Sequence, residues 1–365
     1  MHHYRVRGCV AALLLLLATR PAAGQARKVI VDQDARGPAS TDMLSILLFL
    51  QAPDVDVLGI TLVTGDQWVK EQTLRTLRAV ELARRTDVPV VPGAEYPLLN
   101  SKEESEWWER QYGQFSFKGA WTPRQYHPPD EIPELVEGKP SIVPLEEHAA
   151  NFIIRTVRRY PGEVTIWAGG PLTNIALALR LDPEVATLAK ELVLMGAGFN
   201  VGQGGIHRIN GRREFNWWFD PEAVRIAMSA PWKKITITPV DISVKTRLSE
   251  DIKAAIAKAP TPVAEYHTKF ANPSYMWDEI SAVAWMDPTI ITSAQELYVN
   301  IDIDRGASYG QTIFVEKDMG GEPPVPRHMP SWWQLATVQW DLDTVRFYQR
   351  YIELMSRPPR AGSRE

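Results

Sequence analysis

The stretch KVIVDQDARGPASTDMLSILLFLQA, residues 28–52, indicates how the whole chain folds. It opens with a short apolar run rich in branched side chains, crosses a loop that holds Gly37 and Pro38, and ends in a longer apolar run. Short branched runs are typical of buried strands, and a longer apolar run after a Thr-Asp pair is typical of a helix. We therefore predict a strand, a loop and a helix in this order.

The same alternation continues along the chain. Further strands are predicted at residues 56–66, 88–93, 163–170, 191–198 and 233–241. Further helices are predicted at residues 67–86, 147–160, 172–181 and 220–230. Nearly continuous apolar strands separated by helices indicate an α/β fold in which helices flank a mainly parallel central sheet. Because no domain boundary is visible, we predict a single domain over residues 25–365.

Two segments depart from this alternation of strands and helices. Residues 101–145 are rich in Trp, Pro and Glu, and we predict an insertion there that is packed by Trp107, Trp108 and Trp121. Residues 331–355 carry apolar side chains at helical spacing, and we predict one closing helix.

The first 24 residues have the layout of a cleavable signal peptide. Basic Arg5 and Arg7 precede an apolar stretch over residues 10–18, which is too short to span a bilayer, and small residues follow at 22–24. We therefore expect a secreted or periplasmic protein that begins near Gln25. The single cysteine, Cys9, lies inside this segment, so disulfides, thiol catalysis and cysteine-bound zinc are excluded from the mature chain.

Charge and hydropathy limit the partners. The formal net charge is −4, with acids and bases interspersed, so no basic stripe indicates nucleic acid. No run after the signal segment is long and apolar enough to span a membrane.

Three carboxylates, Asp32, Asp34 and Asp42, gather in the loop between the first strand and the first helix. One interpretation is structural: Thr41 caps the helix, Asp42 favours its first turn, and the other two are hydrated. The other is a cation site, because crowded carboxylates raise one another's pKa unless a cation compensates them. Ca²⁺ is the usual cation for such oxygen ligands.

Other chemistry-bearing residues also follow predicted strands, where ligands bind in α/β sheets. Gly169 and Gly170 allow a close backbone approach, although close strand–helix packing explains them equally well, and Asp66 ends the second strand. Glu214 and Asn216 share one side if this segment is extended, with Trp217 and Trp218 beside them. A surface turn with both tryptophans in the core is the alternative. Asp278 precedes an apolar helix, where it is either a ligand or a cap.

Together these segments resemble the inosine–uridine-preferring nucleoside hydrolase family over most of the mature chain. That family opens with Asp-x-Asp-x-Gly-x-Asp-Asp between a strand and a helix, and DQDARGPASTD occupies this place. The resemblance implies a nucleoside hydrolase-like, Rossmann-like fold. It also implies a Ca²⁺ site formed by Asp34, Asp42, Asp278 and the carbonyl of Gly169, with Asp34 acting as the catalytic base.

The same resemblance implies a set of substrate-binding residues, some of which depart from the family pattern. The triplet Glu214, Phe215 and Asn216 matches a ribose-holding element. Thr41 stands where the family's third aspartate contacts the 2′-hydroxyl, and Asp66 replaces an asparagine that touches the ribose. Either Asn200 or Asn210, in an enlarged loop, reaches the 5′-hydroxyl.

Trp277 stands where many family members carry a histidine that protonates the leaving base. Without that histidine, stacking of the base between Trp217, Trp218 and Trp277 is the other way to assist its departure. Stacking area favours purine nucleosides over uridine or cytidine. His207 is the only histidine placed to act instead.

We therefore expect Ca²⁺-dependent hydrolysis of ribonucleosides to free base and ribose, by a homodimer or homotetramer. Two alternatives stay open. One is a secreted nucleoside- or sugar-binding protein that has lost catalysis, and the other is a protein whose ion is purely structural. Release of free base with and without a chelator separates them.

Overall fold

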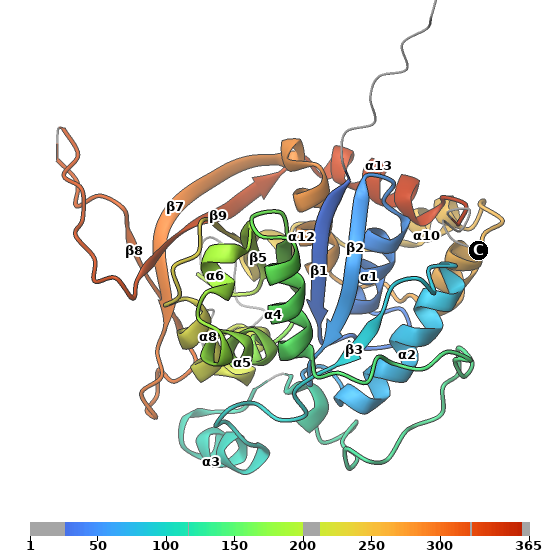
Figure 1. Ribbon diagram of the computed structural model, residues 1–365, viewed down its shortest axis with the longest axis horizontal. Helices are drawn as coiled ribbons and strands as arrows, with labels where there is room; N and C mark the ends of the chain where they lie inside the picture. The colour runs from blue at the N-terminus through green and yellow to red at the C-terminus, as the bar shows by residue number, and fades with distance from the viewer. Residues whose placement is uncertain (1–25, 116, 200–211, 322, 360–365) are drawn as a thin grey trace, which may run out of the picture.

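The computed structural model describes residues 26–115, 117–199, 212–321 and 323–359. Its strands are β1 (Arg27–Gln33), β2 (Val55–Leu62), β3 (Val90–Pro92), β4 (Thr165–Ala168), β5 (Glu191–Met195), β6 (Ile235–Thr238), β7 (Ile291–Ile301), β8 (Thr312–Glu316) and β9 (Gln334–Leu342). They form one nine-stranded sheet in the order β3-β2-β1-β4-β5-β6-β9-β7-β8. The first seven strands of this order pair in parallel, and β7 runs antiparallel to both β8 and β9 at one edge (left in Figure 1). The predicted single α/β domain with a mainly parallel sheet is confirmed.

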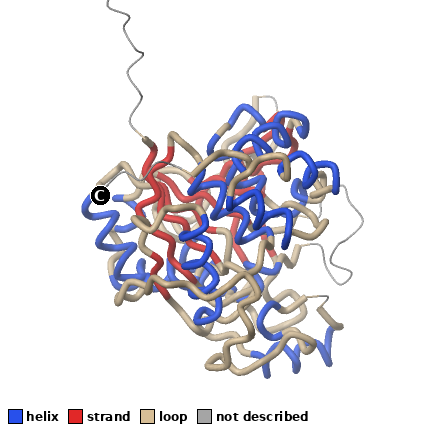
Figure 2. Tube along the Cα trace, turned by 90° about the vertical axis from the view of Figure 1, so that its right-hand side faces the viewer, coloured by secondary structure: helices blue, strands red, loops and turns tan. Residues whose placement is uncertain are grey.

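Helices cover both faces of this sheet (Figures 1 and 2). The helices are α1 (Thr41–Gln51), α2 (Val69–Leu82), α3 (Lys102–Tyr112), α4 (Ala149–Arg159), α5 (Thr173–Leu181), α6 (Val185–Leu188), α7 (Phe215–Phe219), α8 (Pro221–Ala227), α9 (Val240–Ser243), α10 (Glu250–Ile256), α11 (Pro262–Phe270), α12 (Trp277–Met286) and α13 (Thr344–Met355). Short 3₁₀ turns span Gly119–Trp121 (η1) and Pro288–Ile290 (η2). One core contains side chains of α1, α2 and α10 to α13, and the other contains side chains of α4, α5, α6 and α8.

Strand β1 lies between these two cores. Val29 and Val31 belong to the core beneath α1, and Ile30 belongs to the core beneath α4. All three side chains are fully buried, because successive side chains of a strand point to opposite faces and helices cover both. This explains why the strand segments of the sequence are mostly apolar and do not alternate with polar residues.

The C-terminal segment corrects the prediction of one closing helix. Residues 334–342 form strand β9, and only residues 344–355 form helix α13. Leu335, Val338 and Leu342 are three and four residues apart, which imitates a helical stripe. In the structure the buried positions Ala336, Val338 and Leu342 follow the period of a strand instead. The antiparallel strands β7 and β8 were also missed, because most side chains of residues 291–296 are exposed and polar, without a strand-like apolar run.

Residues 101–145 contain helix α3 and η1, and they lie below the ends of the parallel strands (Figure 1). Trp108 and Trp121 are buried, but Trp107 is 49% exposed, so the prediction that Trp107 packs this segment is wrong. Trp121 stacks on Phe219 with ring centroids 4.3 Å apart. The segment is therefore held against the body by two of its three predicted tryptophans.

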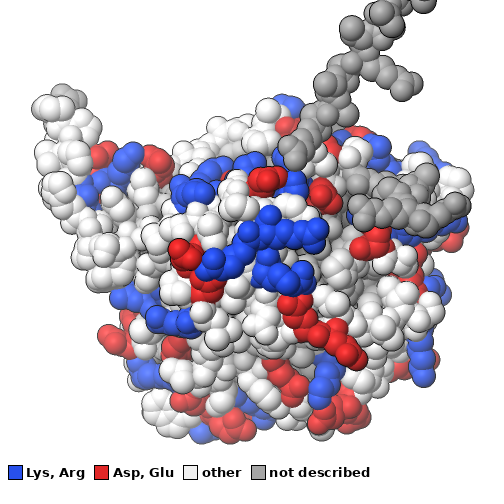
Figure 3. All heavy atoms as spheres, in the orientation of Figure 1, with Lys and Arg blue, Asp and Glu red and all other residues white. Residues whose placement is uncertain are grey.

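On the face shown in Figure 3, basic and acidic side chains lie next to one another rather than in separate patches. Among the described residues, no helix combines the length and the apolarity needed to cross a bilayer.

His267 on α11 leads to a prediction about stability. Its ring is fully buried, Nε2 lies 2.8 Å from the hydroxyl of Tyr351, and burial lowers its pKa to about 4. Between that pKa and the unfolded value of about 6.5 the unfolded chain binds a proton that the folded chain does not. The contribution of neutral His267 to the free energy of unfolding is therefore fully present above pH 6.5 and is lost as the pH falls toward 4.

When the pH falls from 7 to 4.5, the free energy of unfolding of the wild type should decrease by about 2 to 3 kcal/mol more than that of the non-titrating variant His267→Gln. Urea denaturation of both proteins at the two pH values measures this difference. Equal losses in the two proteins would show that His267 is not responsible.

Candidate active site

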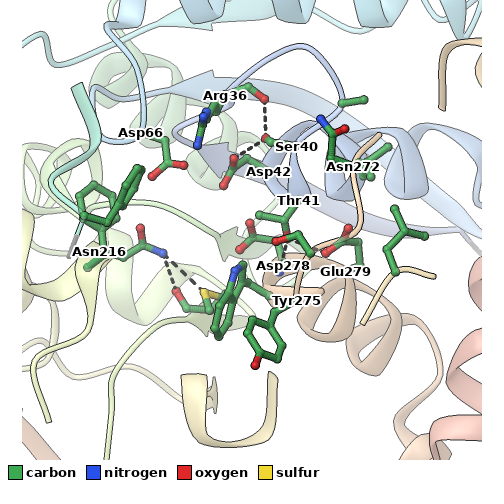
Figure 4. A pocket seen from close by; sticks show the side chains of 18 of the residues that line it. Arg36, Ser40, Thr41, Asp42, Asp66, Asn216, Asn272, Tyr275, Asp278 and Glu279 are labelled. Carbon is green, nitrogen blue, oxygen red and sulfur yellow. Dashed lines mark hydrogen bonds between the residues drawn. The ribbon is translucent and has the colours of Figure 1, made fainter. Parts of the chain in front are cut away.

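A cavity of about 700 Å³ opens where the parallel strands end. Loops after β1 and β2, the segment after β5, and the start of α12 all contribute to its wall, as expected for a ligand site in an α/β sheet. Figure 4 shows acidic side chains from these separate segments pointing toward one another. The lining includes Arg36, Thr41, Asp42, Asp66, Phe115, Phe117, Glu214, Phe215, Asn216, Trp218, Lys269, Tyr275, Trp277, Asp278 and Glu279.

Asp34 lies directly after β1 and is only 1% exposed. Its Oδ2 accepts a hydrogen bond from the backbone N–H of Asp66 at 2.8 Å, while its Oδ1 is buried with no hydrogen-bond partner among the described residues. A Cβ at position 65 would lie 2.1 Å from Oδ2, and one at position 170 would lie 2.8 Å from the backbone nitrogen of Asp34. Gly65 and Gly170 therefore let two loops close on this carboxyl.

Asp42 and Asp278 come from two different helices that start at the same place. Asp42 lies in the first turn of α1 and Asp278 in the first turn of α12, and the two carboxyls share a hydrogen bond. Ser40 also donates to Asp42. The backbone N–H of Asp278 donates to Thr41 Oγ1 at 3.0 Å, which ties the two helix starts together. Thr41 therefore joins the helices and makes no capping bond within α1.

The crowding of these acids shifts their pKa values upward. Burial first, and the negative charges of Asp66 and Asp42 second, raise the pKa of Asp34 well above its usual range. Burial and the charge of Asp42 do the same for Asp66 and Asp278. Arg36 opposes this for Asp42 and Asp66, whose pKa values its positive charge lowers, although burial outweighs it. The cluster is therefore short of positive charge.

The donor set fits a hard cation in its chemistry. It consists of buried carboxyls, and an oxygen of Asp34 and an oxygen of Asp278 have no partner in the described part of the chain. In their present positions, however, no three or more described Asp, Glu, His or Cys side chains are arranged to hold an ion. Asp42 and Asp278 share a hydrogen bond instead. A cation held by both carboxyls would take the place of this contact between Asp42 and Asp278.

The segment from Glu214 to Asn216 differs from the extended arrangement considered for it. Glu214 caps helix α7: Oε1 accepts from the backbone N–H of Asn216 at 2.9 Å, and Oε2 accepts from that of Trp217 at 3.1 Å. Burial raises the pKa of Glu214 to about 7. Asn216 Nδ2 donates to the carbonyl of Gly169 at 2.9 Å. That carbonyl, predicted as an ion ligand, therefore already accepts one hydrogen bond, which leaves one lone pair.

The tryptophans divide between the core and the cavity. Trp217 is fully buried in the core beneath α4 and α5 and does not line the cavity, so its prediction as a substrate contact is wrong. It faces inward because α7 is a helix, which turns neighbouring side chains to different sides. Half-buried Trp277 lines the cavity, with the ring of Tyr275 5.1 Å away. Trp218 and Phe215 also line it.

Asn200 and Asn210, one of which was predicted to reach the 5′-hydroxyl, and His207 lie outside the described residues. Asp32 is buried and does not line the cavity; its Oδ2 accepts from Thr61 at 2.6 Å and from Asn174 at 2.9 Å.

Four charged residues of the cavity wall, Arg36, Arg213, Lys269 and Glu279, were not predicted from the sequence. Arg36 gave no signal because a single basic residue in a loop is usually hydrated. Glu279 did carry a signal in the sequence, because it follows Asp278 at the start of a mainly apolar helix. If the start of that helix is buried, the two adjacent acids cannot both be hydrated. The side chain of Glu279 is 2% exposed, and burial raises its pKa to about 8.

Comparisons with known proteins agree with this geometry. The family model described as inosine-uridine preferring nucleoside hydrolase matches residues 29–349. Probable uridine nucleosidase 2 of Arabidopsis thaliana is 30% identical over 277 residues, which is 75% of this chain and 79% of that protein. The pyrimidine-specific ribonucleoside hydrolase RihB of Escherichia coli is 26% identical over 309 residues, covering 81% of this chain and 90% of the relative.

Solved structures show the same fold. A plant nucleoside hydrolase, PpNRh1, superposes with a TM-score of 0.70 at 22% identity, and the match covers 91% of this chain and 99% of the plant enzyme. A purine-preferring ribonucleoside hydrolase from Gardnerella vaginalis gives a TM-score of 0.70 at 21% identity, and the match covers 90% of this chain and 98% of that enzyme. The family model covers most of the chain, residues 29–349. The chain belongs to the inosine-uridine preferring nucleoside hydrolase family.

Proposed function

We propose that this protein hydrolyses the N-glycosidic bond of ribonucleosides, releasing free base and ribose, with Ca²⁺ as its cofactor. The observation that carries the proposal is that Asp42, Asp66 and Asp278 line one cavity of about 700 Å³, with the buried Asp34 close enough that the charges of Asp66 and Asp42 raise its pKa. That volume is within the range of small-ligand sites. The names of the relatives from Arabidopsis thaliana and Escherichia coli support the same substrate class.

The acidic cavity suits the charge that develops in this reaction. As the base departs, positive charge grows on the ribose, and negative side chains stabilise that charge more than they stabilise the neutral substrate. Asp34 accepts a proton from the attacking water, since its Oδ1 has no partner among the described residues. When bound, Ca²⁺ supplies positive charge that makes a nearby water easier to deprotonate. Asp34, Asp42, Asp278 and the free lone pair of the Gly169 carbonyl would hold it.

Hydroxyls of the ribose are bound by polar side chains of the same wall. The side-chain oxygen of Asn216 accepts no hydrogen bond from a described residue, so it is available to a hydroxyl. Asp66 and Glu214 border the cavity beside it. Glu214 also holds the start of α7 in place through its two backbone hydrogen bonds.

The base is bound by aromatic rings of the cavity wall, where half-buried Trp277 is more accessible than the buried Trp218. Stacking of one base on an aromatic ring contributes about 1 to 3 kcal/mol, so Trp277→Ala should lower kcat/KM by about 5- to 100-fold. Because a two-ring base offers more stacking area, we expect adenosine to be cleaved faster than uridine and to lose more in the variant.

The exposed Trp107 offers a matched control, since Trp107→Ala removes the same side chain at a position that does not line the cavity. Steady-state kinetics on both nucleosides measure the effect. Equal losses for adenosine and uridine, or a similar loss in the control, would show that Trp277 does not stack on the base.

The proposed function is tested by incubating the purified protein with adenosine, inosine, uridine and cytidine, with and without a chelator. We expect free base and ribose, and their loss with the chelator. Binding of a ribonucleoside without release of base would favour the alternative of a binding protein that has lost catalysis. Release that is insensitive to the chelator would contradict the role of Ca²⁺.

Export and assembly are separate proposals. Cleavage of the signal segment over residues 1–24, which lies outside the described residues, would place the protein in the periplasm or outside the cell. A homodimer or homotetramer is the proposed assembly. Mass spectrometry of the exported chain and its sedimentation in solution test the two proposals.

A further inference from the structure

Arg213 is a buried positive charge on the cavity wall that the proposed mechanism does not use. Its side chain lines the cavity and is only 4% exposed. In the described part of the chain its hydrogen bonds go to the backbone carbonyls of Tyr309 at 2.9 Å and Ala307 at 2.7 Å, and to no carboxylate. The segment directly before it, residues 200–211, contains no Asp or Glu. Because a buried charge without an opposite charge is unfavourable, this guanidinium lacks a counter-ion.

The acids of the cavity do not compensate this positive charge. Burial lowers the pKa of Arg213 to about 10, and Asp302, which does not line the cavity, is the acid whose charge raises it. Arg36 behaves differently, since its charge lowers the pKa values of Asp42 and Asp66. The cavity wall therefore carries a cluster of acids next to Arg36 and, apart from them, a second cation.

The guanidinium of Arg213 is fixed by two other segments of the chain. Its central carbon lies 4.2 Å from the ring centre of Trp108 on α3 and 5.7 Å from that of Phe115. Trp108 Nε1 donates to the carbonyl of Gly306 at 3.0 Å, close in the chain to the two carbonyls that Arg213 binds. An arginine fixed in this way loses little freedom when it binds a ligand.

Part of the guanidinium is still free to bind a ligand. The hydrogen bonds to the two carbonyls come from Nε and Nη2, so the N–H groups of Nη1 donate to no described residue. Planar guanidinium groups match the oxygens of phosphate and carboxylate, which they bind with charge-assisted hydrogen bonds. Arg213 therefore suits an anionic group of a molecule that occupies the cavity.

The chemistry of the ribose indicates where that anionic group is attached. In the proposed function the acids surround the reacting carbon C1′, and Glu214 and Asn216, which follow Arg213 in the chain, contact the sugar. The 5′-oxygen is separated from C1′ by more bonds than the 2′- and 3′-oxygens. A phosphate on the 5′-oxygen can therefore extend away from the acids, which repel it, toward a cation that lies apart from them.

We propose that Arg213 binds a phosphate on the 5′-oxygen of the ribose, and that the protein also hydrolyses ribonucleoside 5′-monophosphates. The inference rests on the proposed function. The bond between C1′ and the base nitrogen breaks, and its electron pair leaves with the base. The hydroxyl of a water molecule bonds to C1′, and the remaining proton of that water ends on the base. The phosphate ester stays intact, so the products are free base and ribose 5-phosphate.

The test compares kcat/KM for adenosine 5′-monophosphate and adenosine in the full chain with Ca²⁺. We expect the wild type to cleave the monophosphate at least as well as adenosine. In Arg213→Met the ratio of the two values should fall by about 10- to 100-fold, because hydrogen bonds from a charged group are lost. Arg213→Lys should lose less, since it keeps the charge without the planar fork. Arg124→Met, at an exposed arginine outside the cavity wall, is the matched control and should keep the ratio.

Three results would overturn the proposal. The first is a wild type that cleaves adenosine better than its 5′-monophosphate. The second is an unchanged ratio in Arg213→Met, or in Arg213→Lys if the methionine variant does not fold, which would leave Arg213 only the structural role of holding residues 306–309. The third is a preference for orotidine over uridine that is lost in Arg213→Met without any preference for the phosphate, which would place the anionic group on the base.

Failure of the proposed function gives a different result. If the wild type cleaves neither nucleosides nor nucleotides, calorimetric binding of D-ribose 5-phosphate and D-ribose to the wild type and to Arg213→Met tests the phosphate site alone. Tighter binding of the phosphate by the wild type, with a loss of about 10- to 100-fold in the variant, would support the site. Equal affinities for the two sugars would overturn it. Cleavage of adenosine without any selectivity for the phosphate would uphold the proposed function and overturn only the role of Arg213.

Discussion

Asp34→Asn is expected to lower kcat by about 100- to 10,000-fold, which is the usual contribution of a general base. The amide keeps the shape of the side chain, and its oxygen can still accept the 2.8 Å hydrogen bond from the backbone N–H of Asp66. It cannot take a proton from water at neutral pH, and it removes one negative charge from the cavity. Single-turnover measurements of base release, made at saturating substrate and Ca²⁺, separate this loss from weaker binding.

Asp130→Asn is the matched control for this change, because the side chain of Asp130 is 81% exposed. It should leave kcat unchanged. A turnover of Asp34→Asn within about tenfold of the wild type, well short of the expected loss, would assign the role of base to another group.

Asp278→Ala is expected to weaken Ca²⁺ binding by at least about 100-fold. Loss of a residue that only hydrogen-bonds to a metal ligand costs about 10- to 100-fold in affinity, and loss of a ligand itself should cost more. The variant removes a charged oxygen ligand, and the number of such ligands sets Ca²⁺ affinity. Without Ca²⁺, however, the variant should be at least as stable as the wild type, because it removes a buried carboxyl whose pKa burial and Asp42 raise.

Thermal unfolding with and without Ca²⁺ measures both effects in one experiment. Ca²⁺ at 100 times its Kd should stabilise the wild type by about 2.7 kcal/mol, and the same concentration should stabilise the variant far less. Equal stabilisation of the two proteins would show that Asp278 is not a ligand. A variant that is less stable than the wild type in the absence of Ca²⁺ would mean that Asp278 is mainly structural.

The parallel part of the fold could be predicted because each of its strands is buried on both sides. Residues 29–31 and 166–168 are short apolar runs for this reason, and helix α4 between them carries a clear apolar stripe. Strand β7 pairs antiparallel with β8 and β9 at one end of the sheet, and part of β7 and part of β9 are exposed there. In β9 the small Ala336 fills a buried position while larger apolar residues fall at helical spacing, so the local pattern favours the wrong element.

The candidate site could be predicted where a residue follows directly from a strand or opens a helix. Asp42, Asp66 and Asp278 reach the cavity because their positions along the chain place them at one edge of the sheet. Trp217 was misplaced because the segment is a short helix capped by Glu214 and not extended. Glu279 and Arg36 depend on contacts between distant segments, such as the bond from Thr41 to Glu279, which no local pattern contains.

The dependence of cleavage on Ca²⁺ can be measured by titrating metal-free protein with Ca²⁺ and following bound Ca²⁺ and the rate of adenosine cleavage on the same samples. Cleavage should rise from near zero in proportion to occupancy and level off at one ion per chain. Asp34→Asn should still bind Ca²⁺, though more weakly, and remain slow at full occupancy. Full cleavage in the metal-free protein, or a fully occupied wild type that releases no base from any of the four common ribonucleosides, would contradict the proposed Ca²⁺-dependent hydrolysis.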